Sequence, residues 1–181
     1  MRLASTIIAA AVLSFLAAWP VAAQSPEPTT STVLVPKGTI IVVATRRSYK
    51  SYGASTGTKV TYEVSQDVII DGHLIAKAGD PAVGEILNAH EGKSSLFTSE
   101  AANLRLSVDK VFNFCGDTIE IDFARSEYRR RQGAFGEKKD VEVSKGQLYQ
   151  APTMRPQKVC GTKTSAVPLP IPSNALVGDK D

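Results

Sequence analysis

The sequence is short of the residues and charges on which most catalytic and nucleic-acid-binding sites depend. Its 181 residues contain two cysteines, two histidines and one tryptophan. With 21 basic against 18 acidic side chains, the formal net charge is only +3. This balance provides no broad positive field, so we expect no nucleic-acid partner. The chain is long enough for one domain with a hydrophobic core and too short for two comfortable ones.

Long apolar runs are also missing after the first two dozen residues. The N-terminus has one positive charge at Arg2, a mostly apolar run over 7–18 and a small-residue end at Ala23. This layout is typical of a secretory signal peptide over residues 1–23. The run is shorter than the ~20 residues of a membrane-spanning helix, which disfavours an uncleaved anchor. We expect a periplasmic or secreted protein with no transmembrane helix in the mature chain.

The two cysteines form the only possible internal pair. Export into an oxidising compartment favours a disulfide between Cys115 and Cys160, which would close a loop of about 45 residues. A free buried thiol and a reactive thiol are the alternatives, and a reactive thiol needs a base such as His73 or His90. These two histidines match no zinc-ligand spacing. We predict no catalytic residues, no metal site and no cofactor, and therefore no enzyme.

Alternating apolar residues take the place of helical patterns. Residues 59–65, KVTYEVS, place every second side chain on one apolar face, as in a strand with one buried side. Asp71 and Gly72 join two apolar runs and predict a tight hairpin, because both residues tolerate positive φ. Residues 103–124 alternate again across a turn. Strand signals spaced by about 8–12 residues are typical of an all-β sandwich or barrel.

We therefore predict an all-β protein with a single barrel-like or sandwich domain of about seven to nine short strands over residues 33–153. A flexible lead-in covers residues 24–32, and residues 88–102 have the composition of a long surface loop. From Pro152 on, the chain holds five of its ten prolines. Residues 154–181 are predicted to form a flexible Pro-rich tail that Cys160 partly tethers.

One string recurs within the predicted domain. VLVPKGTIIVVAT at 33–45 returns as VEVSKGQLYQAPT at 141–153, and LIAKAGDPAVGEI at 74–86 is a looser copy. In each copy a glycine, Gly38, Gly146 or Gly79, permits a sharp bend between two strands. Together with Asp71 and Gly72, these are the predicted structural turn residues. Chance similarity and a true duplication both remain open as explanations.

The segment 125–140, RSEYRRRQGAFGEKKD, carries the sharpest local charge. Its basic and aromatic side chains are candidates for binding anionic lipid headgroups, acidic glycans or an acidic partner. The alternative is an ordinary solvated extension of a hairpin. The candidate residues are Arg125, Tyr128, Arg129, Arg130, Arg131, Phe135, Lys138 and Lys139.

The order of these features resembles a periplasmic β-domain of bacterial cell-envelope proteins. The residues that carry the resemblance are Pro36-Lys37-Gly38-Thr39, Val68 to Gly72, Ile75, Lys77, Gly79, Val83, Gly84, Glu85 and Ile86, and the later Leu104, Leu106 and Val111. The domain also looks like the C-terminal β-barrel of the TrbI-type scaffold of conjugative, type IV secretion systems. The resemblance covers about residues 33–153. It implies a barrel-like fold and a periplasmic location, and it brings no catalytic residues.

Two functions of different class follow. The first is an exported, non-enzymatic cell-envelope module that acts through a protein partner or by assembly, using strand edges, the basic segment or the Pro-rich tail. The second is a periplasmic binder of a small ligand or glycan in the mouth of the barrel. An ordered tail or a long unpaired edge strand favours the first function. A pocket lined by aromatic residues favours the second.

Overall fold

A computed structural model describes residues 30–94, 99–129 and 140–178, and all structural statements concern these residues. They form strands and contain no helix, which confirms the predicted all-β, barrel-like fold. Fifteen strands are present within the described ranges, more than the seven to nine expected. The count is higher because five strands are two-residue pairings and because three predicted irregular regions are partly paired.

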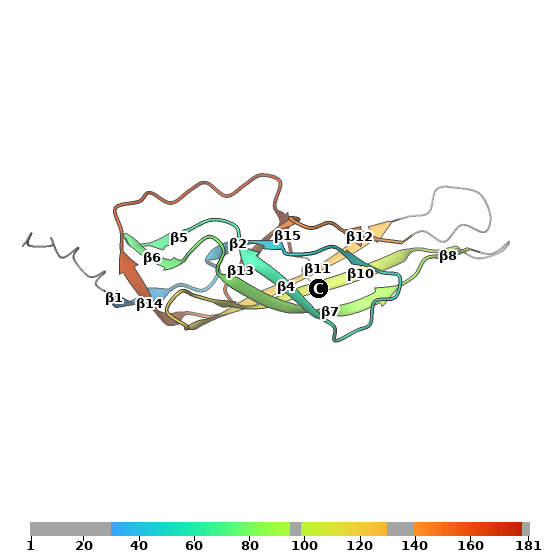
Figure 1. The fold of residues 1–181 in the computed structure, drawn as a ribbon, viewed down its shortest axis with the longest axis horizontal. Coiled ribbons are helices and arrows are strands. Elements are labelled where there is room, and N and C mark those ends of the chain that lie inside the picture. The colour runs from blue at the N-terminus through green and yellow to red at the C-terminus, as the bar shows by residue number, and fades with distance from the viewer. Residues whose placement is uncertain (1–29, 95–98, 130–139, 179–181) are drawn as a thin grey trace, which may run out of the picture.

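A seven-stranded sheet curls into a nearly closed barrel (Figure 1). The isolated bridge between Ile121 and Thr153 joins the two sides, and the Met154 N–H donates to the Glu120 carbonyl at 3.1 Å beside it. In spatial order the strands are β11 (Thr118–Arg129), β10 (Ala102–Phe112), β7 (Pro81–His90), β4 (Lys59–Val64), β2 (Ile40–Thr45), β13 (Leu148–Pro152) and β15 (Leu176–Val177).

A smaller four-stranded sheet lies at one end of the elongated molecule (Figure 1). Its strands, in spatial order, are β1 (Thr30–Val35), β14 (Gln157–Lys163), β6 (His73–Ala76) and β5 (Val68–Ile70). Two short ribbons complete the described structure: β3 (Tyr49–Lys50) with β12 (Glu142–Val143), and β8 (Lys93–Ser94) with β9 (Ser99–Glu100).

Four neighbouring strands of the barrel begin with the same turn. A glycine with positive φ precedes each of β2, β4, β7 and β13, and the residue after it donates a backbone hydrogen bond to the residue two before it. Glycine is required there because an L side chain rarely adopts that conformation. The glycines are Gly38, Gly57, Gly79 and Gly146, with φ of 79°, 82°, 92° and 81°.

These turns dock on one another's strands in reciprocal pairs. The Gly38 N–H donates to the Thr153 carbonyl at 3.0 Å, and the Gly146 N–H donates to the Thr45 carbonyl at 2.8 Å. A second pair repeats this pattern, since the Gly57 N–H donates to the Ile86 carbonyl within β7 and the Gly79 N–H donates to the Val64 carbonyl at the end of β4. The repeated string is therefore a structural unit. A fourth turn of the same kind lies at Gly57. It lacks the lysine that stands one or two residues before the glycine in the other three turns.

Two tyrosines in edge-to-face contact lie in the centre of the barrel core. Tyr62 and Tyr149 meet edge to face with ring centroids 6.1 Å apart, and Phe123 contacts Tyr149 in the same manner at 5.4 Å. The Tyr62 hydroxyl donates to the Ser107 carbonyl at 2.7 Å, whereas the buried Tyr149 hydroxyl has no hydrogen-bond partner within the described structure. Burial raises the pKa of both phenols well above the ordinary value.

Paired strands extend beyond residues 33–153 at both ends. Strand β1 begins at Thr30, inside the predicted lead-in 24–32, and pairs antiparallel with β14, inside the predicted tail 154–181. The tail pairs because Val159 and Gly161 bury one face of β14. The predicted loop 88–102 is also paired, since β7 continues to His90 and β8 pairs with β9.

Candidate interaction surfaces

The predicted disulfide between Cys115 and Cys160 is present and joins the two larger sheets. It links the turn between β10 and β11 to β14. Polar side chains reinforce the link: the Cys160 N–H donates to the Asp117 carboxylate at 2.6 Å, and the Asn113 side-chain amide donates to the Cys160 carbonyl at 3.1 Å. The bond confirms the disulfide interpretation and fits an oxidising compartment outside the cytoplasm.

Most of the predicted basic segment lies outside the described residues. Arg125 is the one candidate whose side chain is described, and its guanidinium donates to the Val177 carbonyl at 2.9 Å and pairs with Glu127 at 3.6 Å. The structure thus gives Arg125 a role in holding the C-terminal strand. Strand β11 includes Tyr128 and Arg129. The other candidates lie outside the described residues: Arg130, Arg131, Phe135, Lys138 and Lys139.

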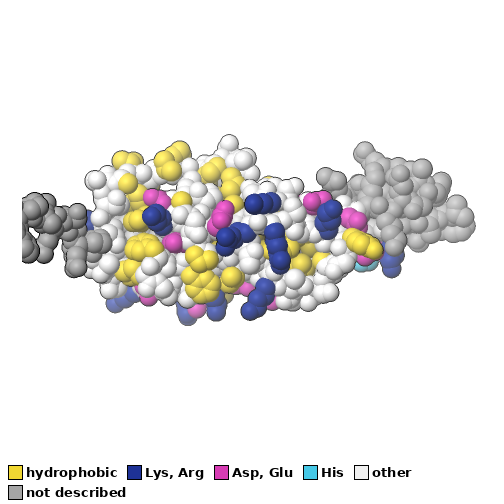
Figure 2. Space-filling model, viewed as in Figure 1, with side chains coloured by type: hydrophobic (Ala, Val, Ile, Leu, Met, Phe, Trp, Pro, Cys, Tyr) yellow, Lys and Arg dark blue, Asp and Glu magenta, His cyan; other side chains and the backbone are white. Residues whose placement is uncertain are grey.

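Residues 164–175, here called the strap, run along one edge of the molecule from β14 to β15 (Figure 1). The Thr164 N–H donates to the Gly72 carbonyl at 2.8 Å, and Gln66 donates to the Leu169 carbonyl at 3.5 Å. The apolar side chains of Val167, Leu169 and Ile171 are 80%, 60% and 45% exposed. Figure 2 shows hydrophobic groups along the same edge. The strap is a fixed segment that presents apolar side chains to solvent.

Strand β15 fills the seam where β11 and β13 diverge. It pairs in parallel with Tyr149 and Gln150 of β13, and Arg125 of β11 holds its last carbonyl. Gly178, which follows the strand, packs so closely on Phe123 that a Cβ atom there would lie 2.9 Å from the ring. The seam therefore fixes the far end of the strap.

The described surface includes an open hollow on each of two regions. One, of about 370 Å³, is lined by β1, β14 and Asp117. The other, of about 300 Å³, lies beside β3 and the turn around Gly57, and Tyr49, Tyr52 and Arg47 contribute to its wall. Only the second hollow has aromatic side chains among its lining residues.

The potential metal-ligating side chains of the described ranges are dispersed. No three histidine, cysteine, aspartate or glutamate side chains lie close enough there to hold a metal ion. His90 contacts Glu100 at 3.1 Å, and His73 bonds the Asp71 carbonyl at 2.9 Å. No helix long and apolar enough to cross a membrane occurs in that part of the chain.

No protein-family model matches the chain, and no curated protein or solved structure is significantly similar to it. The resemblance to TrbI-type barrels therefore stays a prediction from the sequence.

Proposed function

We propose that the protein is an exported, non-enzymatic module of the bacterial cell envelope that acts by binding a partner protein. The observation that carries this proposal is the strap, which is held at both ends and exposes its apolar side chains. The disulfide supports export because such bonds persist in oxidising compartments.

The composition of the strap suits recognition by a protein groove. Val167, Leu169 and Ile171 each precede a proline, which keeps them out of the helical region and favours the polyproline II conformation. The strap contains no charged residue, so it offers no electrostatic attraction to a nucleic acid or an anionic membrane. A fixed polyproline II segment loses little entropy on binding, and aromatic-lined grooves bind such segments. A protein with an aromatic-lined groove is therefore the partner we propose.

The competing function, a small-ligand or glycan binder in the barrel mouth, has less support at that position. Tyr62, Tyr149 and their neighbours are fully buried and occupy the centre of the barrel. The hollow beside Tyr52 lies outside the barrel mouth and is a separate place on the surface for a ligand.

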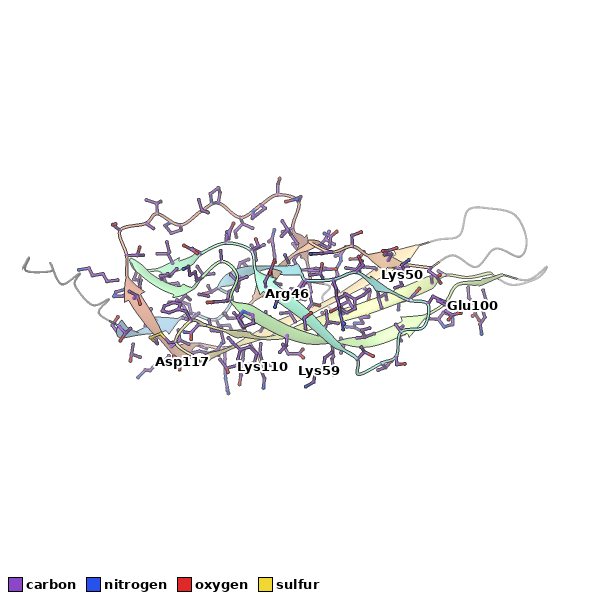
Figure 3. All side chains as sticks on the ribbon, in the orientation of Figure 1. Arg46, Lys50, Lys59, Glu100, Lys110 and Asp117 are labelled. Atoms are coloured by element: carbon purple, nitrogen blue, oxygen red, sulfur yellow. A yellow bond between two sulfur atoms is a disulfide. The ribbon has the colours of Figure 1, made fainter. Side chains whose placement is uncertain are left out.

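Photocrosslinking in the native envelope tests the proposal. A photoreactive amino acid at Leu169 of the full chain should capture one defined partner, and a synthetic peptide with the strap sequence AVPLPIPSN should compete for it. The same group at exposed Lys110, on β10 (Figure 3), is the control position and should not capture that partner.

A variant with Val167, Leu169 and Ile171 changed to Ser keeps all prolines and should lose the partner. Phe114→Ser removes an exposed hydrophobic side chain elsewhere, 40% exposed, and should keep it. Equal capture from Leu169 and Lys110, or capture that the peptide does not reduce, would sink the proposal.

A further inference from the structure

Arg47 is an exposed guanidinium that the fold holds in place without a carboxylate. Its centre lies 5.1 Å from the Tyr49 ring centroid, and its Nε donates to the Tyr49 hydroxyl at 3.0 Å. The Tyr49 hydroxyl is itself fixed by the Thr61 N–H at 2.8 Å. Arg47 Nη2 donates to the Lys59 carbonyl at 3.4 Å, and no ion pair to Arg47 occurs in the described parts of the chain. A charged group held by neutral partners is ready to bind an anion.

Arg46, the next residue, shows the contrast. Its guanidinium pairs with Glu63 at 3.5 Å, and Arg46 does not line the hollow. Lys50 does line the hollow, and its ammonium pairs with Glu142 at 3.4 Å. Figure 3 labels Arg46 and Lys50, which flank the short segment that carries Arg47 and Tyr49. The charges of Lys50 and Glu142 offset each other, so the guanidinium of Arg47 leaves the site with one net positive charge.

The remaining wall of the hollow combines one aromatic platform with hydroxyl groups. Tyr52 is 62% exposed, although its ring is large and mostly apolar. Ser48, Ser55 and Thr58 supply side-chain hydroxyls around the same volume of about 300 Å³. The segment between Lys50 and Tyr52 is fixed, because the Ser51 N–H donates to the Val141 carbonyl at 2.9 Å and the Ser51 hydroxyl accepts from the Val141 N–H at 3.0 Å.

We propose that this hollow binds an acidic saccharide, with Arg47 on its carboxylate and Tyr52 against the apolar face of its ring. The planar guanidinium matches a carboxylate in geometry, and one net positive charge matches a singly charged acid better than a phosphate. The hydroxyls of Ser55 and Thr58 match the donors and acceptors of a sugar. This binding site goes beyond the proposed protein-binding function and does not rest on it.

Titration of the oxidised mature protein, followed by amide chemical shifts, tests the site with three probes. D-Glucuronate has the ring and the carboxylate, D-glucose has the ring alone, and acetate has the carboxylate alone. We expect D-glucuronate to shift the amides of Arg47, Tyr52 and Gly53 with a millimolar Kd, and at least about tenfold weaker binding of the other two probes. Equal binding of acetate or of glucose, or no shift with D-glucuronate at about 50 mM, would overturn the proposal.

Two matched pairs of variants locate the binding. Arg47→Gln should weaken D-glucuronate binding at least about tenfold, whereas Arg46→Gln, which removes the same charge one residue away, should change it less than about twofold. Tyr52→Ala should also weaken binding, and Phe114→Ala should not. Because Arg47 contacts buried Tyr49, Tyr52→Ala decides the test if Arg47→Gln fails to fold. Equal losses in Arg46→Gln and Arg47→Gln would show non-specific charge attraction and contradict the site.

Discussion

Thr45 and Thr153 perform the same task in the two copies of the repeated string. The Thr45 hydroxyl donates to the Ser144 carbonyl at 2.7 Å and accepts from the Gln147 N–H at 3.1 Å. The Thr153 hydroxyl donates to the Pro36 carbonyl at 2.7 Å and accepts from the Thr39 N–H at 3.0 Å. Thus each turn is held by a threonine of the other copy, Thr45 at the end of β2 and Thr153 directly after β13.

We predict that Thr45→Val and Thr153→Val each lower the free energy of unfolding by about 1–3 kcal/mol, because each leaves partly buried backbone groups without their side-chain partner. Chemical denaturation measures the loss. The Ser variants at the same positions keep the hydroxyl and should lose less. A full-sized loss at one threonine and none at the other would contradict the reciprocal arrangement.

The two central tyrosines should respond to the same substitution with opposite signs. The Tyr149 hydroxyl is buried without a partner in the described structure, so Tyr149→Phe should raise the free energy of unfolding by about 1 kcal/mol. Tyr62→Phe removes a buried hydrogen bond to the Ser107 carbonyl and should lower it by about 1–2 kcal/mol. Urea unfolding of the two variants gives both numbers. Destabilisation by Tyr149→Phe would mean that its hydroxyl has a partner in solution.

At the scale of the element, β15 depends on close packing by Gly178. A larger side chain there would meet Phe123 and the Ala124 carbonyl, so Gly178→Val should push β15 out of the seam. We expect faster amide hydrogen exchange in β15 and a loss of about 1–2 kcal/mol of stability. Val177→Ala, which trims a side chain that is 57% exposed, is the control on the same strand. Unchanged exchange in Gly178→Val would show that β15 does not depend on this contact.

The elements that the sequence predicts well are those whose signals are local. The alternation at 59–65 becomes β4, and Asp71-Gly72 forms the predicted turn, with φ of 48° and 71°. Strands β14 and β15 were missed because their partners lie far away in the chain: β14 pairs with β1, whose Val33 faces Val159. A proline-rich composition indicates only the local conformational preference of such a segment. It does not indicate whether a strand far away in the sequence will pair with it.

The candidate sites show the same limit. Charge density singled out the segment 125–140, although its one described candidate side chain, Arg125, contacts the chain's own C-terminal strand. Arg47 gave no comparable signal, since its neighbour Arg46 looks identical in the sequence. The difference between them arises from Tyr49 and Glu63, which the fold brings to one arginine each.

At the scale of the whole molecule, the disulfide cross-links the nearly closed barrel to the four-stranded sheet. The disulfide lies near Asp117 at the end of the molecule that holds β1 and β14 (Figure 3). The sequence separation between its cysteines is 45 residues, and the chain-entropy model gives about 4 kcal/mol for closing such a loop. The hydrogen bonds of Asn113 and Asp117 to Cys160 join the same two sheets, so the sheets retain a non-covalent connection when the bond is removed.

We therefore predict that the Cys115→Ala/Cys160→Ala variant still folds and is less stable than the oxidised protein by about 3–4 kcal/mol. Guanidinium unfolding followed by circular dichroism measures the difference. The wild-type protein under reducing conditions is the matched control, because it lacks the cross-link while keeping both sulfur atoms, and it should lose nearly as much. If the double variant unfolds with the same midpoint as the oxidised protein, the cross-link does not stabilise the fold. Two separate transitions in the variant would show that the disulfide is what makes the two sheets unfold together.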